Sequence, residues 1–125
     1  MGIFNRLLGT AAEVNIDKLE KEFETILVEG ESIQHAYALI RDLIVFTDKR
    51  LVLVDKQGLT GKKQTVLSIP YSSIVKFSKE TKGRFDTDAE VKIWVRGEAA
   101  PTEFEFPENR NIHDVYKVLG SYLLE

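Results

Sequence analysis

The sequence predicts a mainly β domain in which seven antiparallel strands form a small barrel or a crossed pair of sheets, covered by a C-terminal helix. Two apolar runs, Leu43–Phe46 and Leu51–Val54, flank a short polar link, which is typical of a hairpin. Residues 90–96 and 103–106 alternate between apolar and charged or polar, as strands with one solvated face do. Residues 112–123 place apolar side chains at helical spacing.

Length and composition are those of one soluble globular domain, because the chain has 125 residues, 43% hydrophobic and 30% charged. The expected parts are an N-terminal segment (1–12), an N-terminal helix (15–28), a barrel (32–107) and a capping helix (111–124). The chain has no cysteine, which excludes a disulfide framework and a thiolate metal site and suits the reducing conditions of the cytoplasm, where we expect the protein.

The first helix is predicted from apolar residues on one face and charged residues on the other. The apolar positions are Ile16, Leu19, Phe23, Ile26 and Leu27. Asn15 and Asp17 precede this pattern, Asp17 and Glu20 have the spacing of a capping box, and Gly30 can end the helix in a left-handed conformation.

Seven strands follow in order. They are expected at Ser32–Ile40, Leu43–Phe46, Leu51–Val54, Gln64–Ile69, Ile74–Lys79, Glu90–Arg96 and Glu103–Phe106. Pro70 should end the fourth strand because proline has no amide donor for a central ladder. Asn111 is a candidate cap for the last helix.

The second and third strands are apolar on both faces, whereas an antiparallel sheet with one solvated face should alternate. Each large apolar side chain left in water would forgo about 1.5–3 kcal/mol of burial. Either the N-terminal helix or another subunit must therefore cover them. Trp94 in the sixth strand, between Lys92 and Arg96, is expected to face outward and forms a candidate oligomer interface.

Charge is segregated along the chain. Residues 1–40 carry 3 basic and 7 acidic side chains, residues 41–84 carry 10 and 4, and residues 85–125 carry 4 and 9. A basic middle between acidic ends could attract an anionic partner or let two copies associate, and pairing within one subunit explains the pattern equally well.

Two stretches, Phe46–Leu51 and Ser68–Ile74, together with the order of the elements and the C-terminal helix, resemble the bacterial pleckstrin-homology-like domain from about Asp17 to Leu124. The resemblance implies a split, crossed β-barrel capped by the C-terminal helix. It also implies a binding or assembly module without enzymatic activity, and ring-forming homo-oligomers, with the pentamer as the expected ring.

The sequence departs from the eukaryotic pleckstrin pattern in two places. Only Arg41 precedes the first apolar run, where phosphoinositide binders carry several basic residues, and the tryptophan usual in their C-terminal helix is absent. Both departures argue against phosphoinositide binding.

Catalytic, metal and cofactor motifs are not found. His35 and His113 lack patterned carboxylate or cysteine partners, and no serine lies in a Gly-x-Ser-x-Gly elbow. The loop from Gly58 to Lys63 fails the spacing and the strand-to-helix context of a phosphate loop, so a hairpin loop accounts for it better. No enzymatic activity is predicted.

Basic residues near the loops form the candidate anion-binding set: Arg41, Lys56, Lys62, Lys63, Lys79, Lys82 and Arg84. Ordinary solvated loops are the favoured alternative. Nucleic acid is not expected, because the chain is acidic overall and lacks exposed aromatic residues interleaved with basic ones.

The leading functional prediction is a non-enzymatic module that self-associates into a homo-oligomer and serves as a protein-interaction scaffold. The alternative is a binder of a membrane surface or an anionic ligand through the basic loops, with Met1–Leu8 as an amphipathic anchor. No other sequence feature supports binding to a membrane.

Overall fold

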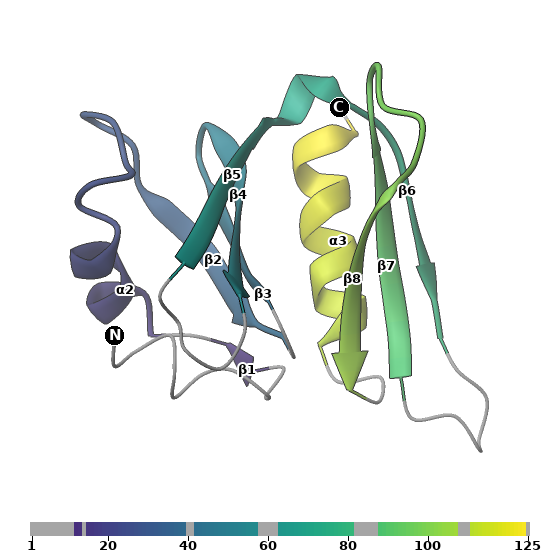
Figure 1. Ribbon diagram of the computed structural model, residues 1–125, viewed down its shortest axis with the longest axis horizontal. Helices are drawn as coiled ribbons and strands as arrows, with labels where there is room; N and C mark the ends of the chain where they lie inside the picture. The colour runs from purple at the N-terminus through teal and green to yellow at the C-terminus, as the bar shows by residue number, and fades with distance from the viewer. Residues whose placement is uncertain are drawn as a thin grey trace. The chain divides into compact units, whose positions relative to one another are not determined.

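The computed structural model describes residues 12–13, 15–39, 42–57, 63–81, 88–107 and 111–124. The chain divides into two compact units, residues 1–69 and 70–125, and each is described by itself. The elements are β1 (Ala12–Glu13), α2 (Ile16–Glu22), β2 (Ile33–Ala38), β3 (Asp42–Thr47), β4 (Arg50–Gln57), β5 (Lys63–Pro70), a 3-10 turn η1 (Tyr71–Ser73), β6 (Ile74–Glu80), β7 (Asp88–Val95), β8 (Thr102–Pro107) and α3 (Ile112–Leu123) (Figure 1).

The first unit is built on a five-stranded sheet in the order β1-β2-β3-β4-β5. The predicted hairpin is confirmed, since β3 and β4 pair antiparallel with Ile44 opposite Leu53 and Val45 opposite Val52. The short strand β1, which lies opposite the end of β2 with Ala12 paired to Ala38, was not predicted. Two residues are too few to show a strand period.

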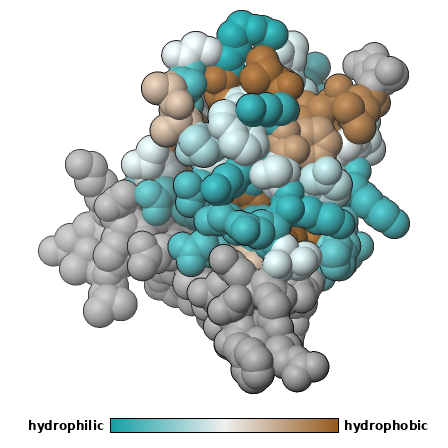
Figure 2. All heavy atoms as spheres, turned by 90° about the vertical axis from the view of Figure 1, so that its right-hand side faces the viewer, coloured by the Kyte–Doolittle hydropathy of each residue, from teal (hydrophilic) through white to brown (hydrophobic). Residues whose placement is uncertain are grey.

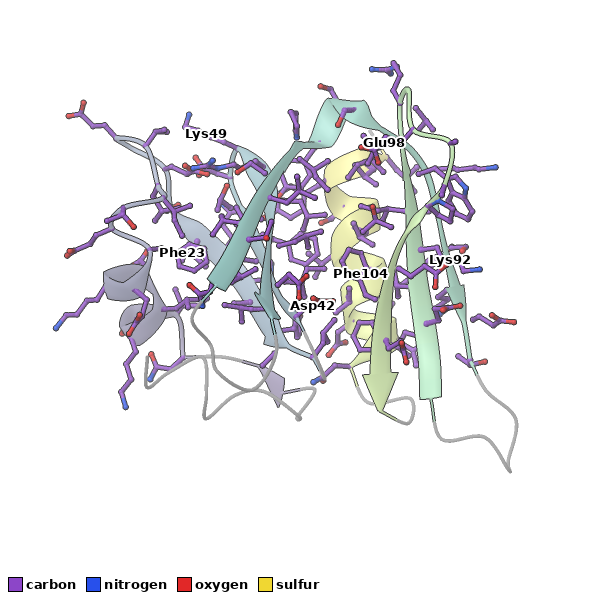
Figure 3. All side chains as sticks on the ribbon, viewed as in Figure 1. Phe23, Asp42, Lys49, Lys92, Glu98 and Phe104 are labelled. Carbon is purple, nitrogen blue, oxygen red and sulfur yellow. The ribbon has the colours of Figure 1, made fainter. Side chains whose placement is uncertain are left out.

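Helix α2 covers one face of this sheet. Leu19 and Phe23 are fully buried and share one core cluster with side chains of β2, β3 and β4 (Figure 3). The expectation that the N-terminal helix covers the doubly apolar strands is therefore met within the first unit. The residues of β3 and β4 that face the opposite way, such as Ile44, Phe46 and Leu51, are also fully buried.

The N-terminal helix is shorter than the predicted 15–28. Asn15 caps it as expected, accepting a 3.2 Å hydrogen bond from the amide of Lys18, but α2 ends at Glu22 and single turns follow. The amide of Val28 bonds instead to Oε1 of Glu31, at 3.0 Å, and the carbonyl of Ile26 accepts from Arg50. These partners replace the helical bonds that would have carried the helix further.

Glu31 forms a hydrogen-bonded clamp with Thr47 and Arg50 of the β3–β4 turn, and these two residues lie in one of the stretches that carry the family resemblance. Nε and Nη2 of Arg50 each donate to a carboxylate oxygen of Glu31 at 2.8 Å. The hydroxyl of Thr47 donates to Glu31 at 2.6 Å and accepts from the amides of Lys49 and Arg50. The clamp fixes the hairpin turn to the loop that precedes β2.

The second unit pairs the three-stranded antiparallel sheet β6-β7-β8 with α3 (Figure 1). Phe104 and Phe106 of β8 are buried, as are the residues of α3 at the predicted helical spacing, Ile112, Val115 and Leu119. Gly97 turns the chain between β7 and β8 with a φ of 88°, a conformation that favours glycine. The predicted last helix and sixth and seventh strands are confirmed.

The sequence predicted a small barrel or a crossed pair of sheets, in the form of a split barrel, and the two sheets of the structure are not closed into a barrel. The described strands form two separate antiparallel sheets, and no described strand belongs to both sheets. Pro70 ends β5, and the 3-10 turn η1 separates it from β6, so hydrogen-bond pairing is not continued from one sheet to the next. Within the described ranges, no helix is long and apolar enough to cross a membrane.

Candidate interaction surface

Strand β7 presents Lys92 and Trp94 on one face and buries the residues between them. Val91 and Ile93 are fully buried, whereas Lys92 and Trp94 are half-buried, as strand alternation requires. Lys92 points away from α3, and Phe104 of the neighbouring strand points toward it (Figure 3). The sequence placed Lys92 and Trp94 on this outer face, and the structure agrees.

Lys76 of β6 completes the surface around the tryptophan. Its Nζ lies 4.7 Å from the centre of the Trp94 ring, a cation–π contact, and Lys76 is opposite Trp94 in the ladder. Sequence reasoning missed Lys76 because the pairing is irregular between Ile74 and Lys76. Such a bulge shifts the alternation of the strand, and no sequence feature marked its position.

The outer face of this sheet is rich in charge. Nζ of Lys92 lies 3.7 Å from a carboxylate oxygen of Glu90, and Lys92 is opposite Glu103 in the ladder. Glu103 and Glu105 of β8 are exposed. This side of the molecule shows a broad hydrophilic band, with hydrophobic residues gathered toward its upper end (Figure 2). We call the set Lys76, Lys92 and Trp94 the Trp94 face.

Arg96, the third residue of the predicted interface, lies just beyond β7. Its amide donates to the carbonyl of Ser73 at 2.7 Å, which joins the end of β7 to the η1 turn, and the residue is exposed. Arg96 therefore follows the Trp94 face along the chain without sharing the strand. That these three residues form an oligomer interface stays a prediction.

The candidate anion-binding set is not brought together by the described residues. Lys79 is exposed on β6, where its Nζ lies 2.8 Å from Nδ1 of His113 and 4.8 Å from the centre of the Tyr116 ring. Lys56 and Lys63 belong to β4 and β5, but their side chains fall outside the described residues. The remaining four, Arg41, Lys62, Lys82 and Arg84, lie outside them entirely.

The lowered pKa of Glu31 belongs to the clamp of the first unit and not to the candidate anion-binding set. The hydrogen bonds and charge of Arg50 lower the pKa of Glu31 to about 2, against the opposing effect of burial. His35 lies edge-on to Phe46, with ring centres 6.3 Å apart. Across the described ranges, no three histidine, aspartate or glutamate side chains converge as metal ligands would.

Comparison with known proteins gives relatives over almost the whole chain. The family model for the Bacterial PH domain matches residues 2–123. The uncharacterized protein YjqA of Bacillus subtilis is 51% identical over 122 residues, which cover 97% of this chain and 98% of that protein.

Two solved structures are also similar to this chain in sequence and in fold. A DUF1696 family protein with a pleckstrin-homology domain from Shewanella loihica is 44% identical with a TM-score of 0.81, covering 93% of this chain and 99% of the other. A pleckstrin homology domain from Shewanella amazonensis is 45% identical with a TM-score of 0.80, covering 89% and 100%. The fold is therefore pleckstrin-homology-like, as the resemblance implied, and its two sheets are not closed into a barrel.

Proposed function

The chain belongs to the bacterial PH domain family, and on this premise we propose that it is a non-enzymatic binding and assembly module that associates with copies of itself. The proposal takes the assembly as a protein-interaction scaffold. Its location is proposed to be the cytoplasm, where a chain without cysteine is unaffected by reducing conditions.

The Trp94 face is the observation that carries the proposal. Trp94 is the sole tryptophan of the chain and remains half-exposed on an outer strand face, beside two lysines. Tryptophan is enriched among the residues that dominate protein interfaces, because its large ring buries much area for little loss of conformational freedom. Lys76, whose Nζ lies 4.7 Å from the centre of the ring, adds a cationic group beside this tryptophan.

Charge suggests how copies would meet. Residues 41–84 carry an excess of basic side chains, and residues 85–125 an excess of acidic ones. Opposite charges on different surfaces favour a heterologous contact, in which one patch of a subunit meets a different patch of the next. Heterologous contacts close into a ring when the rotation between subunits allows it, and we propose a ring, with five subunits as the expected number.

Light scattering on the purified protein at micromolar concentration and moderate salt tests the proposal. We expect a single species with several times the 14.2 kDa mass of the chain. Trp94→Ala and Lys92→Glu should lower the mass, while Lys117→Glu, at an exposed position of α3, should leave it unchanged. A monodisperse 14 kDa species from the unmodified chain would overturn the proposal.

Sedimentation with anionic vesicles separates this function from the alternative of a membrane-surface or anionic-ligand binder. The assembly proposal expects the protein to stay in the supernatant even at low salt, where contacts between exposed lysines and an anionic surface are least screened. If the protein sediments with vesicles, and Lys62→Glu abolishes sedimentation with the oligomer intact, the alternative holds instead.

A further inference from the structure

The turn at residues 28–31 exposes an apolar side chain to solvent. Val28 is 54% exposed, and Glu29 and Gly30 beside it are exposed as well. Both hydrogen-bonding groups of the Val28 backbone are nevertheless paired with Glu31. The Val28 amide donates to Oε1 of Glu31 at 3.0 Å, and the Val28 carbonyl accepts from the amide of Glu31 at 3.0 Å. The backbone of this turn is therefore satisfied internally while the Val28 and Glu29 side chains remain exposed.

The clamp holds this turn in place. The Glu31 carboxylate that binds the Val28 amide also accepts two hydrogen bonds from Arg50. Nη2 of Arg50 donates in addition to the carbonyl of Ile26 at 2.6 Å, two residues before Val28. Gly30 has a φ of 83°, a conformation that favours glycine. An apolar residue on a turn that is fixed in this way loses little conformational freedom when a partner packs on it.

Charge distinguishes Val28 from the other large apolar residues that are exposed in the described part of the chain. Glu29 follows Val28 directly, Glu24 lies four residues earlier, and both are exposed. Neither glutamate has an ion pair among the described residues. The other exposed apolar residues have no described carboxylate next to them in the chain; they are Val66, Leu67, Val75 and Leu124.

The Trp94 face offers the complementary chemistry. The half-exposed ring of Trp94 is an apolar surface, and Nζ of Lys76 lies 4.7 Å from its centre. Among the described residues, Lys76 has no ion pair, whereas Nζ of Lys92 lies 3.7 Å from a carboxylate oxygen of Glu90. The positive charge that lacks a described carboxylate partner is therefore the one at the ring. An apolar residue with a carboxylate next to it fits this combination.

We propose that the Trp94 face of one copy of the chain receives the turn at residues 28–31 of the next copy. In this contact Val28 packs against the Trp94 ring and Glu29 pairs with Lys76. The inference rests on the proposed function, because it names the surface that the Trp94 face contacts in the assembly. A second copy is the occupant because this turn supplies both the apolar side chain and the negative charge, and it is open to solvent in the single chain.

The contact is heterologous, because the two surfaces that meet are different. The turn belongs to residues 1–40, which carry an excess of acidic side chains, and Lys76 to residues 41–84, which carry an excess of basic ones. Each copy would present its turn to one neighbour and its Trp94 face to the other, as a ring requires. A tryptophan packed on an apolar residue, with charged groups around it, is typical of the residues that dominate interfaces.

Substitution of Val28 tests the packing. Val28→Lys places a positive charge against Lys76, so we expect light scattering at micromolar concentration to show a mass close to the 14.2 kDa of a single chain. The matched control is Val66→Lys, because Val66 is also an exposed valine, at 41%, and lies outside the proposed contact. The control should leave the mass of the assembly unchanged.

Charge reversal tests the ion pair. Glu29→Lys and Lys76→Glu should each lower the mass, because each sets two like charges against one another. The double variant restores opposite charges, and its mass should return toward that of the unmodified chain. The matched control combines Glu29→Lys with Lys117→Glu. This pair has the same net charge but leaves two lysines facing each other at the contact, so its mass should stay low.

The fluorescence of Trp94 gives a measurement at the contact itself, because Trp94 is the sole tryptophan of the chain. Val28 covers the ring in the proposed assembly. Val28→Lys should therefore shift the emission to longer wavelength and increase its quenching by acrylamide, whereas Val66→Lys should change neither.

The outcomes separate this inference from the proposed function. A 14 kDa unmodified chain would overturn both. Three results would overturn the Val28 contact alone: a mass unchanged by Val28→Lys, a double charge reversal that does not recover the mass, or Trp94 emission that does not respond to Val28→Lys. The proposed function would stand in these cases, because Trp94→Ala tests the Trp94 face whatever surface it contacts.

Discussion

Arg50 donates hydrogen bonds to both carboxylate oxygens of Glu31, from its Nε to one and from its Nη2 to the other, each at 2.8 Å. The Glu31 side chain is fully buried, whereas the Arg50 side chain keeps 21% of its surface exposed. The two partners of this ion pair therefore differ in their exposure to water. Removal of the arginine leaves a charge without water, and removal of the glutamate leaves one that water can still reach.

Arg50→Met should destabilise the protein more than Glu31→Gln does. We expect the free energy of unfolding to fall by about 3–5 kcal/mol in Arg50→Met, because this variant leaves a buried carboxylate without its partner. In Glu31→Gln we expect a fall of about 2–3 kcal/mol. Urea denaturation measures both. Lys49→Met, at an exposed position of the same turn, is the control and should change stability by less than about 0.5 kcal/mol. A reversed order would contradict the burial argument.

Acid should weaken the clamp over a defined range of pH. Arg50 lowers the pKa of Glu31 from 4.5 to about 2 in the folded protein. Because the folded pKa is below the unfolded one, the stabilisation is fully present above pH 4.5 and is lost as pH falls toward 2. The difference in unfolding free energy between the unmodified chain and Glu31→Gln should therefore narrow between these values. A difference that stays constant would show that Glu31 is not the titrating group.

The strands were predictable because local patterns determined them. The apolar runs around Thr47–Arg50 and the alternation along Glu90–Trp94 each follow from burial of one or both faces, which acts within a few residues. The last helix was predictable for the same reason, since Ile112, Val115 and Leu119 recur at helical spacing and are all buried.

The clamp and Lys76 depend on contacts between distant residues. Glu31 and Arg50 are 19 positions apart, and in the sequence Glu31 is one of several glutamates near the end of a helical pattern. The position of Lys76 beside Trp94 depends on an irregular pairing that side-chain pattern does not encode. The number of strands predicted a small barrel or a pair of sheets without deciding between them, because pairing between the two sheets is a tertiary property that the strand count does not determine.

The stacked rings of Tyr71 and Tyr122 should contribute to the stability of the second unit. Their centres are 4.5 Å apart and their planes differ by 11°, which is a stacked geometry. Aromatic pairs contribute about 0.5–1.5 kcal/mol beyond their burial. Tyr122→Leu should therefore lower the unfolding free energy by about 1 kcal/mol more than Tyr122→Phe, which keeps the ring. Equal losses in urea denaturation would assign the effect to the hydroxyl instead.

Two glycines should respond to alanine in opposite directions. Gly30 has a φ of 83°, so alanine there is strained, although among the described residues no atom beyond its two chain neighbours lies within 4 Å of the added methyl group. Gly120 lies inside α3, where the methyl group would make ordinary contacts with Leu124 and Phe77 at 3.7 and 3.9 Å.

Gly30→Ala should therefore lower the unfolding free energy by about 1–2 kcal/mol, and Gly120→Ala should raise it by about 0.5–1 kcal/mol. Thermal and urea denaturation of both variants measure the two signs. Gly30→Asn is the control for the first, because asparagine tolerates positive φ and should lose less than alanine does. Since Gly30 immediately precedes Glu31, a loss for Gly30→Ala that disappears in the Arg50→Met background would show that the turn stabilises the fold by positioning the buried carboxylate.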